Sequence, residues 1–593
     1  MKKLLAILLA AVLVLSLAAC SGSGESTADE GTKEAEAQEA EAEAEEGGET
    51  EPAGGNYQTA IDLYQNGVKE YKYKAGEFKK YDEPITLTVN NTHDLDSDTF
   101  EAMRAAGEPV ENGRWIQYFR DDMNIEWVFG WCESNSADYN QKLTLSMSEG
   151  ALADVFYVSD QNMIRQLAEA GAILPLTELW QDNVNETLGR IMEEEGTAIY
   201  GTGIVDGEFY ALPVKMPSTN TYNHCWIRRD WLEKVGMDVP STMDEVKEVA
   251  KAFKELADGN IGLCFSKDFM SEMEGVFWAF GGQQNSRRNQ WNKQEDGTIA
   301  YAEIQDNMKG GFEWLRDMYA EGLIPQESIS MGTYDALANY VATEKCGLFY
   351  GPHWYGFQLQ NFGFKTQNYG MGSEGEADWI EIPLPKGTVD TVIIPGNNTN
   401  DGWYCINANC EHPEAVIQTL NAYVEKLFGE NNDFANFFAC DLNSGEWNAS
   451  PIHVLSATVD LDPYWILSKA TNKETQEVDE SKLYEPGTSY WNYIKAGLSA
   501  YQYMFGPIDS CFCYVDETYP QNILWNEYLF IPTQTYTDRW GSLVEILDNY
   551  EIKIVTGELD LDEGFAEMVQ KFNEAGGAVI SEEYNEIYAD FTK

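Results

Sequence analysis

Short apolar runs alternate with amphipathic stretches along most of this chain. Residues 83–94, EPITLTVNNTHD, place β-branched and apolar side chains between a proline and a polar loop, which predicts a strand. A second apolar run, residues 151–160, predicts another strand, and the helical periodicity after it ends at Gly171. This alternation indicates α/β layers around a mainly parallel sheet. In such sheets ligands bind beyond the carboxyl ends of the strands, where polar residues follow both predicted strands.

The clearest helix signal begins at Thr242. Thr242 and Glu245 have the spacing of a capping box, and Gly259 marks the end of the helix. Between them, apolar residues recur at helical intervals: Val246, Val249, Ala250, Phe253 and Leu256. Further along, the stretch DGTIAY predicts a hairpin whose turn is formed by Asp296-Gly297.

The second half of the chain continues the alternation of strands and helices. EKCGLFYGPHWYGF predicts a strand that leads into a loop of glycine, proline and aromatic residues. Residues 402–428 predict a strand, a turn with Pro413 and a helix from about Glu414. Near the C-terminus, two helical stretches are separated by Gly576-Gly577. The buried stripe predicted for the first of them consists of Phe565, Met568, Val569 and Phe572.

The first residues have the pattern of a bacterial lipoprotein signal. Two lysines precede an apolar run from Leu4 to Leu17, which is shorter than a typical membrane span. Leu17-Ala18-Ala19-Cys20 resembles the lipobox, in which the cysteine receives a diacyl group with chains such as palmitate and becomes the mature N-terminus. This predicts a signal peptide over residues 1–19 and a lipid anchor at Cys20. An ordinary secretory signal and a short anchor helix are the alternatives.

Composition separates a linker from a folded body. Residues 20–55 are mainly Glu, Ala, Gly, Ser and Thr without aromatic residues, which predicts a lipid anchor followed by an acidic, disordered linker. The body from about residue 56 is rich in aromatic residues, and its length predicts two or more lobes. The net charge of −60 argues against nucleic acid or anionic lipid as a partner. Of the ten cysteines, we expect most to be small, buried, free thiols.

Five stretches of the body, taken in order, carry a resemblance to a known family. They are Trp226-Ile227-Arg228-Arg229-Asp230-Trp231-Leu232, Val239-Pro240-Ser241-Thr242, Gly310 to Pro325, Gly402 to Pro413, and Thr556-Gly557-Glu558 through Gly576-Gly577. They resemble the extracellular solute-binding lipoproteins of bacterial ABC importers, family 1, in the large sugar-binding subgroup of the LplA/LipO type. The resemblance runs from about residue 83 to the C-terminus. It implies a periplasmic-binding-protein-like α/β fold, in which two lobes joined by a hinge enclose the ligand cleft.

On this resemblance we expect an N-terminal extension over residues 56–82 and a solute-binding body over residues 83–593. Lobe 1 would comprise about residues 83–212 and lobe 2 about residues 213–350, each with later crossing segments. The implied function is that of the substrate-binding component of an ABC transporter, which captures a carbohydrate, commonly an oligosaccharide, for import. A peptide-binding ABC receptor and a surface glycan-binding adhesin without a transporter are the alternatives.

The resemblance also implies where the protein acts and with what. We expect a monomer that is held by its lipid anchor on the extracytoplasmic face of the cell membrane. Its partners would be the carbohydrate, the permease subunits of the transporter and the membrane itself, with no nucleic acid. Binding without chemical change is implied, so the protein is not expected to be an enzyme.

A sugar presents an apolar face and a rim of hydroxyl groups, so its receptor needs flat aromatic rings and fixed polar groups. Aromatic residues beside glycines in loops after strands fit this need. Arg539 could fork to two hydroxyl groups, with a structural salt bridge as the alternative. For each tryptophan, packing in the core is the alternative. The predicted ligand-binding residues are Asn91, Asp160, Tyr210, Trp278, Trp354, Trp403, Trp465, Tyr501 and Arg539.

Two other kinds of site can be weighed against sugar binding. Residues 292–303, NKQEDGTIAYAE, approach the spacing of an EF-hand calcium loop, but the first position lacks its acid. A hairpin explains the same residues, so we expect neither a metal nor another cofactor. No G-x-S-x-G, H-E-x-x-H or P-loop motif occurs in the sequence. A pair of carboxylates could still form a glycosidase site, which the sequence alone does not exclude.

Overall fold

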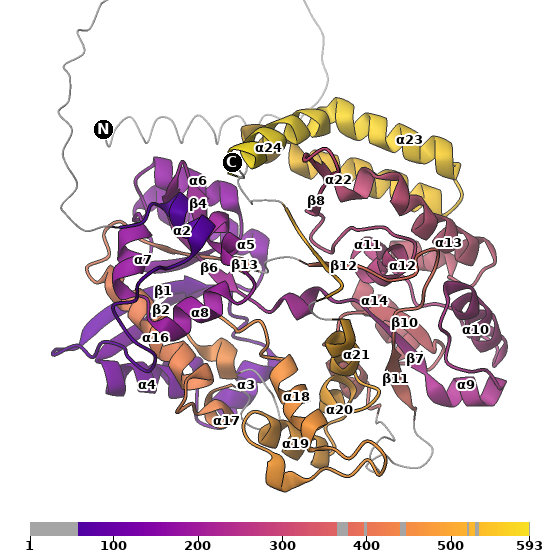
Figure 1. The fold of residues 1–593 in the computed structure, drawn as a ribbon, viewed down its shortest axis with the longest axis horizontal. Coiled ribbons are helices and arrows are strands. Elements are labelled where there is room, and N and C mark those ends of the chain that lie inside the picture. The colour runs from indigo at the N-terminus through magenta and orange to yellow at the C-terminus, as the bar shows by residue number, and fades with distance from the viewer. Residues whose placement is uncertain are drawn as a thin grey trace, which may run out of the picture.

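The computed structural model describes residues 57–591, apart from 365–376, 397–399, 439–445, 519–520 and 528–532. Within these residues the chain forms two lobes that lie side by side, each built on a β-sheet with helices around it (Figure 1). The predicted signal peptide, Cys20 and the acidic linker lie outside the described residues. None of the described helices is long and apolar enough to cross a membrane.

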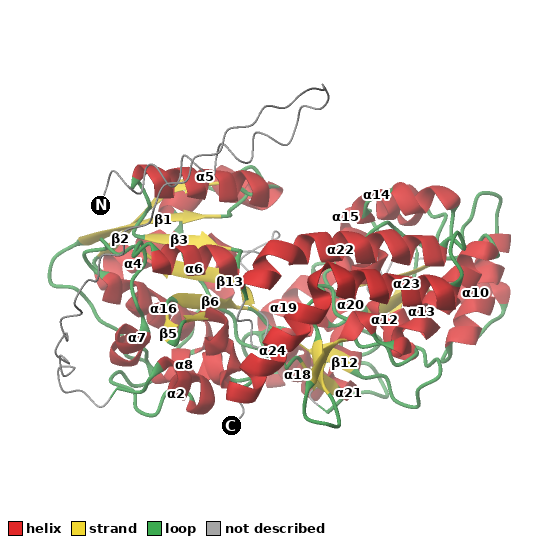
Figure 2. Cartoon of the chain, turned by 90° about the horizontal axis from the view of Figure 1, so that it is seen from above, coloured by secondary structure: helices red, strands yellow, loops and turns green. Residues whose placement is uncertain are grey.

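Lobe 1 contains a five-stranded mixed sheet. Its strands lie in the order β2 (Ile125–Cys132), β1 (Ile85–Asn91), β3 (Val155–Val158), β13 (Asn400–Ile406) and β6 (Ala211–Lys215). β1 pairs in parallel with β2 and β3, whereas β13 runs antiparallel to β3 and β6. One face is covered by α4 (Arg114–Met123) and α16 (Pro413–Phe428), and the other by α5 (Ser136–Glu149) and α6 (Gln161–Glu169). Figure 2 shows α5 along one side of this sheet.

The predicted N-terminal extension is packed onto lobe 1. In α2 (Ala60–Asn66), Ala60 and Leu63 are buried in the same core as the sheet. Tyr73 forms a bridge to Asn185, whose side chain also donates a hydrogen bond to the carbonyl oxygen of Glu77 at 3.1 Å. Because β6 pairs with β13 as far as Lys215, the chain leaves lobe 1 after that residue, slightly later than the predicted boundary.

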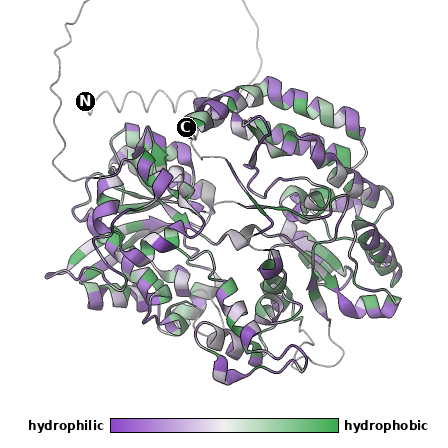
Figure 3. Ribbon diagram, viewed as in Figure 1, coloured by the Kyte–Doolittle hydropathy of each residue, from purple (hydrophilic) through white to green (hydrophobic). Residues whose placement is uncertain are grey.

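Lobe 2 contains a three-stranded antiparallel sheet. Its strands lie in the order β10 (Leu348–Gly351), β7 (His224–Arg228) and β11 (Trp379–Ile382). One core joins this sheet to α10 (Met243–Glu255), α13 (Lys309–Ala320), α22 (Gln534–Val555), α23 (Leu561–Phe572) and α24 (Ala578–Phe591). α23 alternates between hydrophilic and hydrophobic residues along its length (Figure 3). Of its predicted stripe, Phe565, Met568 and Phe572 are buried and Val569 is partly buried.

Four helices connect the lobes below the gap seen in Figure 1. This connecting segment comprises α18 (Leu461–Ala470), α19 (Gly487–Lys495), α20 (Ser499–Phe505) and α21 (Cys511–Thr518). Tyr503 of α20 packs edge-on against Trp226 of β7, with ring centroids 6.2 Å apart. Both rings belong to the apolar cluster that also fills one face of lobe 1, where it contains Trp115. The two lobes therefore share a continuous core through the connecting segment.

Most of the local sequence predictions are confirmed. α10 begins with the predicted capping box between Thr242 and Glu245. β8 (Trp291–Lys293) and β9 (Ile299–Tyr301) form the predicted hairpin. The backbone of Gly576 has φ 134°, which breaks the helical path between α23 and α24. The eight cysteines in the described residues are free thiols, and six of them are buried.

The expectation of a mainly parallel sheet is wrong. The two main sheets contain two parallel strand pairings, β1–β2 and β1–β3, and four antiparallel ones. β13 enters the lobe 1 sheet after the chain has returned from lobe 2, and it arrives from the opposite end to β3. Local strand and helix signals do not record the direction of such a return.

Candidate functional site

A cavity of about 600 Å³ lies where the two lobes meet, and it is called the interlobe cavity below. Its lobe 1 wall consists of residues 159–162, at the carboxyl end of β3 and the start of α6, and residues 400–403 of β13. Its lobe 2 wall consists of Arg287, Asn289, Tyr536, Thr537, Trp540 and Gly541. The volume falls in the range of about 300–1,000 Å³ that is typical of small-molecule sites.

Aromatic residues line this cavity from both lobes. On α22, Trp540 stacks on Tyr536 with ring centroids 4.7 Å apart and an interplanar angle of 22°. Behind it, Tyr301 packs edge-on at 5.2 Å, so the indole is held by its neighbours. Across the cavity, Trp403 of β13 is 7% exposed, and its indole nitrogen donates to the hydroxyl of Thr202 at 3.0 Å. The tryptophans are therefore fixed before any ligand arrives.

Glycine allows β13 to present Trp403 in this way. Gly402 has φ 125°, a conformation that residues with a side chain rarely adopt. A Cβ atom there would lie 2.5 Å from the hydroxyl of Tyr157. The pairing of β13 with β6 shifts register between Asn400 and Trp403, so the glycine lies within an irregularity of the strand next to the cavity.

Polar groups form the rest of the wall and join the lobes across it. The side chain of Asp160 caps α6 by accepting a hydrogen bond from the backbone nitrogen of Asn162 at 2.9 Å. Arg287 of lobe 2 donates to the carbonyl oxygen of Asn400 at 2.9 Å and to the carboxylate of Asp401 at 2.8 Å. Thr537 of α22 donates to the side chain of Asn162. Three side-chain hydrogen bonds thus connect lobe 1 to lobe 2 at this cavity.

A second cavity of about 270 Å³ is lined by aromatic residues of the connecting segment, of lobe 1, and of the loop after β10 with α15 (Tyr355–Asn361). Trp354, which is 39% exposed, and Tyr501 lie on its wall. His353 is buried and Asp460 is half-buried in the same wall. Burial, helped by His224, lowers the pKa of His353 to about 3, and burial raises the pKa of Asp460 to about 7. This cavity offers aromatic surface but few ionised groups at neutral pH.

The structure separates the nine predicted ligand-binding residues into several groups. Asp160 and Trp403 line the interlobe cavity, and Trp354 and Tyr501 line the second one. Trp465 lines another cavity of about 380 Å³, where its indole nitrogen donates to Asp516 at 2.6 Å.

The other four predicted residues do not line these cavities. Asn91 is buried and bonds to His93, and Trp278 is 1% exposed, with its indole nitrogen bonded to the carbonyl oxygen of Gln284. Tyr210 is half-buried against the core beneath α6. The exposed Arg539 lies beside Gly576. Trp278 therefore packs in the core, which is the alternative to ligand binding that the sequence left open for each tryptophan.

Sequence reasoning missed most of the lobe 2 wall. Tyr536 and Trp540 are four residues apart near the start of α22, and this spacing places both rings on one face of a helix. The cap at Thr533, whose hydroxyl accepts from the backbone nitrogen of Tyr536, supplies a helix-start signal. That local pattern could have indicated the ring pair, whereas nothing local indicates that Arg287 faces Asp401.

The residues of the near-match to an EF-hand have other partners. Asp296 accepts hydrogen bonds from the backbone nitrogen and the hydroxyl of Thr298, at 3.0 and 2.6 Å, within the turn of the hairpin. Glu303, at the position of the last calcium ligand, binds the guanidinium of Arg288 at 2.8 Å. The hairpin and an ion pair therefore account for these side chains.

Comparison with known proteins places these features in a family. The family described as bacterial extracellular solute-binding protein matches residues 97–426. The fructooligosaccharide ABC transporter substrate-binding protein FusA of Streptococcus pneumoniae is 26% identical over 224 residues, 35% of this chain and 40% of FusA. Lipoprotein LipO of Bacillus subtilis is 29% identical over 147 residues, 24% of this chain and 26% of LipO. The aligned segments thus span less than half of either relative.

Solved structures show the same architecture over nearly the whole body. The structure of an EF-hand mutant of S. pneumoniae FusA in complex with fructo-nystose has a TM-score of 0.56 and 17% sequence identity, and the match covers 86% of this chain and 99% of that one. At this identity the likeness establishes the fold.

Proposed function

Since this chain belongs to the family of bacterial extracellular solute-binding proteins, we propose that it captures an oligosaccharide outside the cytoplasmic membrane for import by an ABC transporter. The predicted two-lobed α/β fold is confirmed by the likeness to solved members of this class. The name of FusA states that it serves a fructooligosaccharide transporter, and that relative supports a carbohydrate as the ligand here.

The observation that carries the proposal is the composition of the interlobe cavity. Tyr536 and Trp540 offer ring surface from lobe 2 opposite the buried Trp403 of lobe 1, and Asp160, Asn289 and Arg287 offer hydrogen-bonding groups around it. Rings can stack on the apolar face of a sugar while carboxylate, amide and guanidinium groups bind its hydroxyls. Because the walls belong to different lobes, a ligand bound here would contact both and stabilise the closed arrangement.

The charges of the cavity favour a neutral oligosaccharide over a uronate. Two carboxylates, Asp160 and Asp401, lie on its wall, and the guanidinium of Arg287 is already bound to Asp401. An anionic sugar would therefore meet carboxylates, and the described residues of the wall offer no further cation to offset them. Neutral hydroxyl groups can instead donate to these carboxylates and accept from Arg287.

The relatives are binding proteins, and we propose that this chain also releases its ligand unchanged. We further propose that Cys20 carries the lipid anchor and that the body acts as a monomer on the extracytoplasmic face, where it meets the permease subunits. Loss of membrane association in a Cys20→Ala variant, measured by fractionation of cells, tests the anchor. A variant that stays with the membrane would contradict it.

A thermal-shift screen with neutral gluco- and fructo-oligosaccharides, oligogalacturonides and peptides tests the ligand. A ligand at a hundredfold its dissociation constant should stabilise the protein by about 2.7 kcal/mol. We expect a neutral oligosaccharide to raise the melting temperature. A shift with peptides alone would favour a peptide receptor. Release of shorter sugars from the bound oligosaccharide would identify an enzyme.

Matched tryptophan variants then locate the site. Trp540→Ala should weaken oligosaccharide binding at least about tenfold, since truncating a well-packed contact residue costs on the order of 2 kcal/mol. Trp354→Ala makes the same change in the second cavity and should leave affinity within about twofold. Calorimetric titration of both variants measures this. If only Trp354→Ala weakens binding, the ligand lies in the second cavity.

A further inference from the structure

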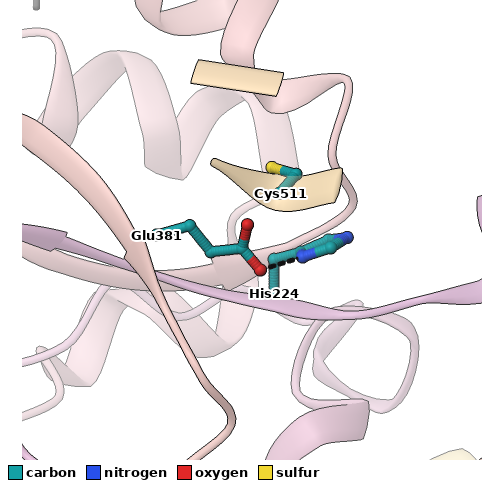
Figure 4. A group of neighbouring side chains, drawn as sticks. All are labelled: His224, Glu381 and Cys511. Carbon is teal, nitrogen blue, oxygen red and sulfur yellow. Dashed lines mark hydrogen bonds and ion pairs between the residues drawn. The ribbon is translucent and has the colours of Figure 1, made fainter. Parts of the chain in front are cut away.

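Three side chains with metal-binding atoms lie together in lobe 2, outside the interlobe cavity. Figure 4 shows the imidazole of His224 and the carboxylate of Glu381, which come from neighbouring strands, with the sulfur of Cys511 facing them. His224 is on β7, Glu381 on β11 and Cys511 at the start of α21. One ligand atom from each residue lies within 4.8 Å of the other two. The exposed fractions are 2%, 3% and 0%, respectively.

Part of this group has no partner in the described structure. Nδ1 of His224 bonds to Oε1 of Glu381, but Nε2 of the same imidazole and Oε2 of the same carboxylate are buried without a hydrogen-bond partner among the described residues. A buried polar atom without a partner costs about 1–3 kcal/mol. A cation between the carboxylate, the imidazole and the sulfur would satisfy the carboxylate more fully than the His224 ion pair and the nearby Cys511 thiol do.

We propose that His224, Glu381 and Cys511 bind one divalent transition metal ion, with Zn²⁺ as the best fit. Imidazole nitrogen, carboxylate oxygen and thiolate sulfur are the ligands that Zn²⁺ takes in proteins, whereas Ca²⁺ and Mg²⁺ require oxygen atoms. With bonds of about 2.0–2.3 Å, tetrahedral ligand atoms lie roughly 3.3–3.8 Å apart. The three ligand atoms lie within 4.8 Å of one another, so shifts on the order of 1 Å at the side-chain tips would bring them to this spacing.

The surroundings leave room for a fourth ligand. A cavity of about 330 Å³ is lined by both His224 and Glu381, so solvent can reach the metal position from that side. Lys386, Asp390 and Glu517 lie on the same wall. Three protein ligands with one position open to water are the arrangement of zinc sites that exchange their fourth ligand.

The metal would act as a tie between two parts of the fold. Two ligands belong to the sheet of lobe 2, and the third belongs to the connecting segment that also packs against lobe 1. Because the metal ion would bind the folded chain and not the unfolded one, it would stabilise the contact of α21 with β7 and β11. This role does not depend on the ligand of the interlobe cavity.

Cobalt titration of purified, chelator-treated protein tests the proposal without any sugar. Co²⁺ should bind with a stoichiometry of one and produce a thiolate-to-cobalt charge-transfer band, and Zn²⁺ should displace it and raise the melting temperature. Cys511→Ala should abolish the band. The matched control is Cys405→Ala, which removes an equally buried thiol from the sheet of lobe 1 and should keep the band.

A second variant covers the case in which Cys511→Ala fails to fold. Glu381→Gln retains the shape of the side chain and the sulfur ligand, and it should weaken Zn²⁺ binding at least about tenfold while circular dichroism stays native. Absence of the charge-transfer band in the wild type would overturn the proposal. So would a band that survives Cys511→Ala, or Zn²⁺ affinity that Glu381→Gln leaves unchanged.

Discussion

Arg288 is the centre of a buried charge cluster in lobe 2, and its removal should destabilise this lobe strongly. Its guanidinium donates to Glu303 at 2.8 Å and to Glu551 at 2.7 Å, and it also contacts Asp548. The side chains of Glu303 and Glu551 are each 1% exposed. One oxygen of each carboxylate has no hydrogen-bond partner in the described part of the chain. The cluster joins both ends of the β8–β9 hairpin to α22.

Arg288→Met retains an apolar side chain of similar length but leaves two buried carboxylates without their cation. Removing one partner of a buried ion pair costs about 3–5 kcal/mol. In a lobe of roughly 200 residues this corresponds to a fall in melting temperature on the order of 10 °C. The neighbouring Arg287 provides a matched control, because it pairs with Asp401 and the two side chains are 42% and 58% exposed. Arg287→Met should therefore cost less than about 1 kcal/mol.

The cost of Arg288→Met should also depend on pH. Burial raises the pKa of Glu551, and the positive charge of Arg288 opposes that rise. Without Arg288 the pKa should rise further, so the folded variant holds a proton that the unfolded chain releases. A group whose pKa is raised on folding contributes stability that is lost as pH rises. Because burial already raises the pKa of Glu551 to about 8 in the wild type, the difference between variant and wild type should shrink as pH falls from about 9.5 to about 7.

Thermal melts of the wild type and both arginine variants at these two pH values measure the effect. Near-ultraviolet circular dichroism follows the loss of tertiary packing around Trp291 and Trp540, which lie in the same core region. Equal falls in melting temperature for Arg287→Met and Arg288→Met would refute the reasoning. A gap that stays constant with pH would show that the buried carboxylates are not the source of the cost.

Two further predictions concern the wild-type fold. Burial raises the pKa of Glu272 and of Asp460 to about 7, so both bind a proton more tightly in the folded state. Their joint contribution to the free energy of unfolding should rise by about 1–2 kcal/mol as pH falls from about 8 to about 6.5. Chemical denaturation across this pH range measures the rise, and the double variant Glu272→Gln with Asp460→Asn should lack it. A double variant with the same pH dependence as the wild type would contradict this. Thr242→Ala removes the hydroxyl that accepts from the backbone nitrogen of Glu245 at 3.2 Å and should cost about 1 kcal/mol in the same assay. Thr144→Ala, in the interior of α5, should cost clearly less, and equal losses would argue against capping.

Sequence was most informative where the determinants of structure are local. The capping box of α10 lies within four residues, and so does the turn of the β8–β9 hairpin. The rule that ligands bind at the carboxyl ends of strands pointed to Asp160, which lines the interlobe cavity, and also to Asn91, which is buried away from it. Such features depend on neighbours in the chain, and these are visible in the sequence.

Features that depend on distant pairings could not be read in this way. β13 pairs with strands that precede it by about two hundred residues, and this pairing made the lobe 1 sheet mixed. The sequence surroundings of Trp278 and Trp540 are similar, because each tryptophan lies close to a glycine and to another aromatic residue. The first is enclosed in the core that continues from lobe 1 through the connecting segment, and the second lines the interlobe cavity, so only the packing of the whole chain distinguishes them.

The late position of β13 in the chain has a consequence for biosynthesis. β6 has β13 as its sheet neighbour, and β3 is open on that side until Asn400–Ile406 are in place. A growing or stalled chain that ends before residue 400 therefore carries two unpaired strand edges, which are templates for pairing with other chains. Because β13 follows the strands of lobe 2 in the chain, these edges of lobe 1 are covered only after the sheet of lobe 2 has been synthesised. Fragments ending at the lobe boundary are accordingly poor choices for recombinant expression.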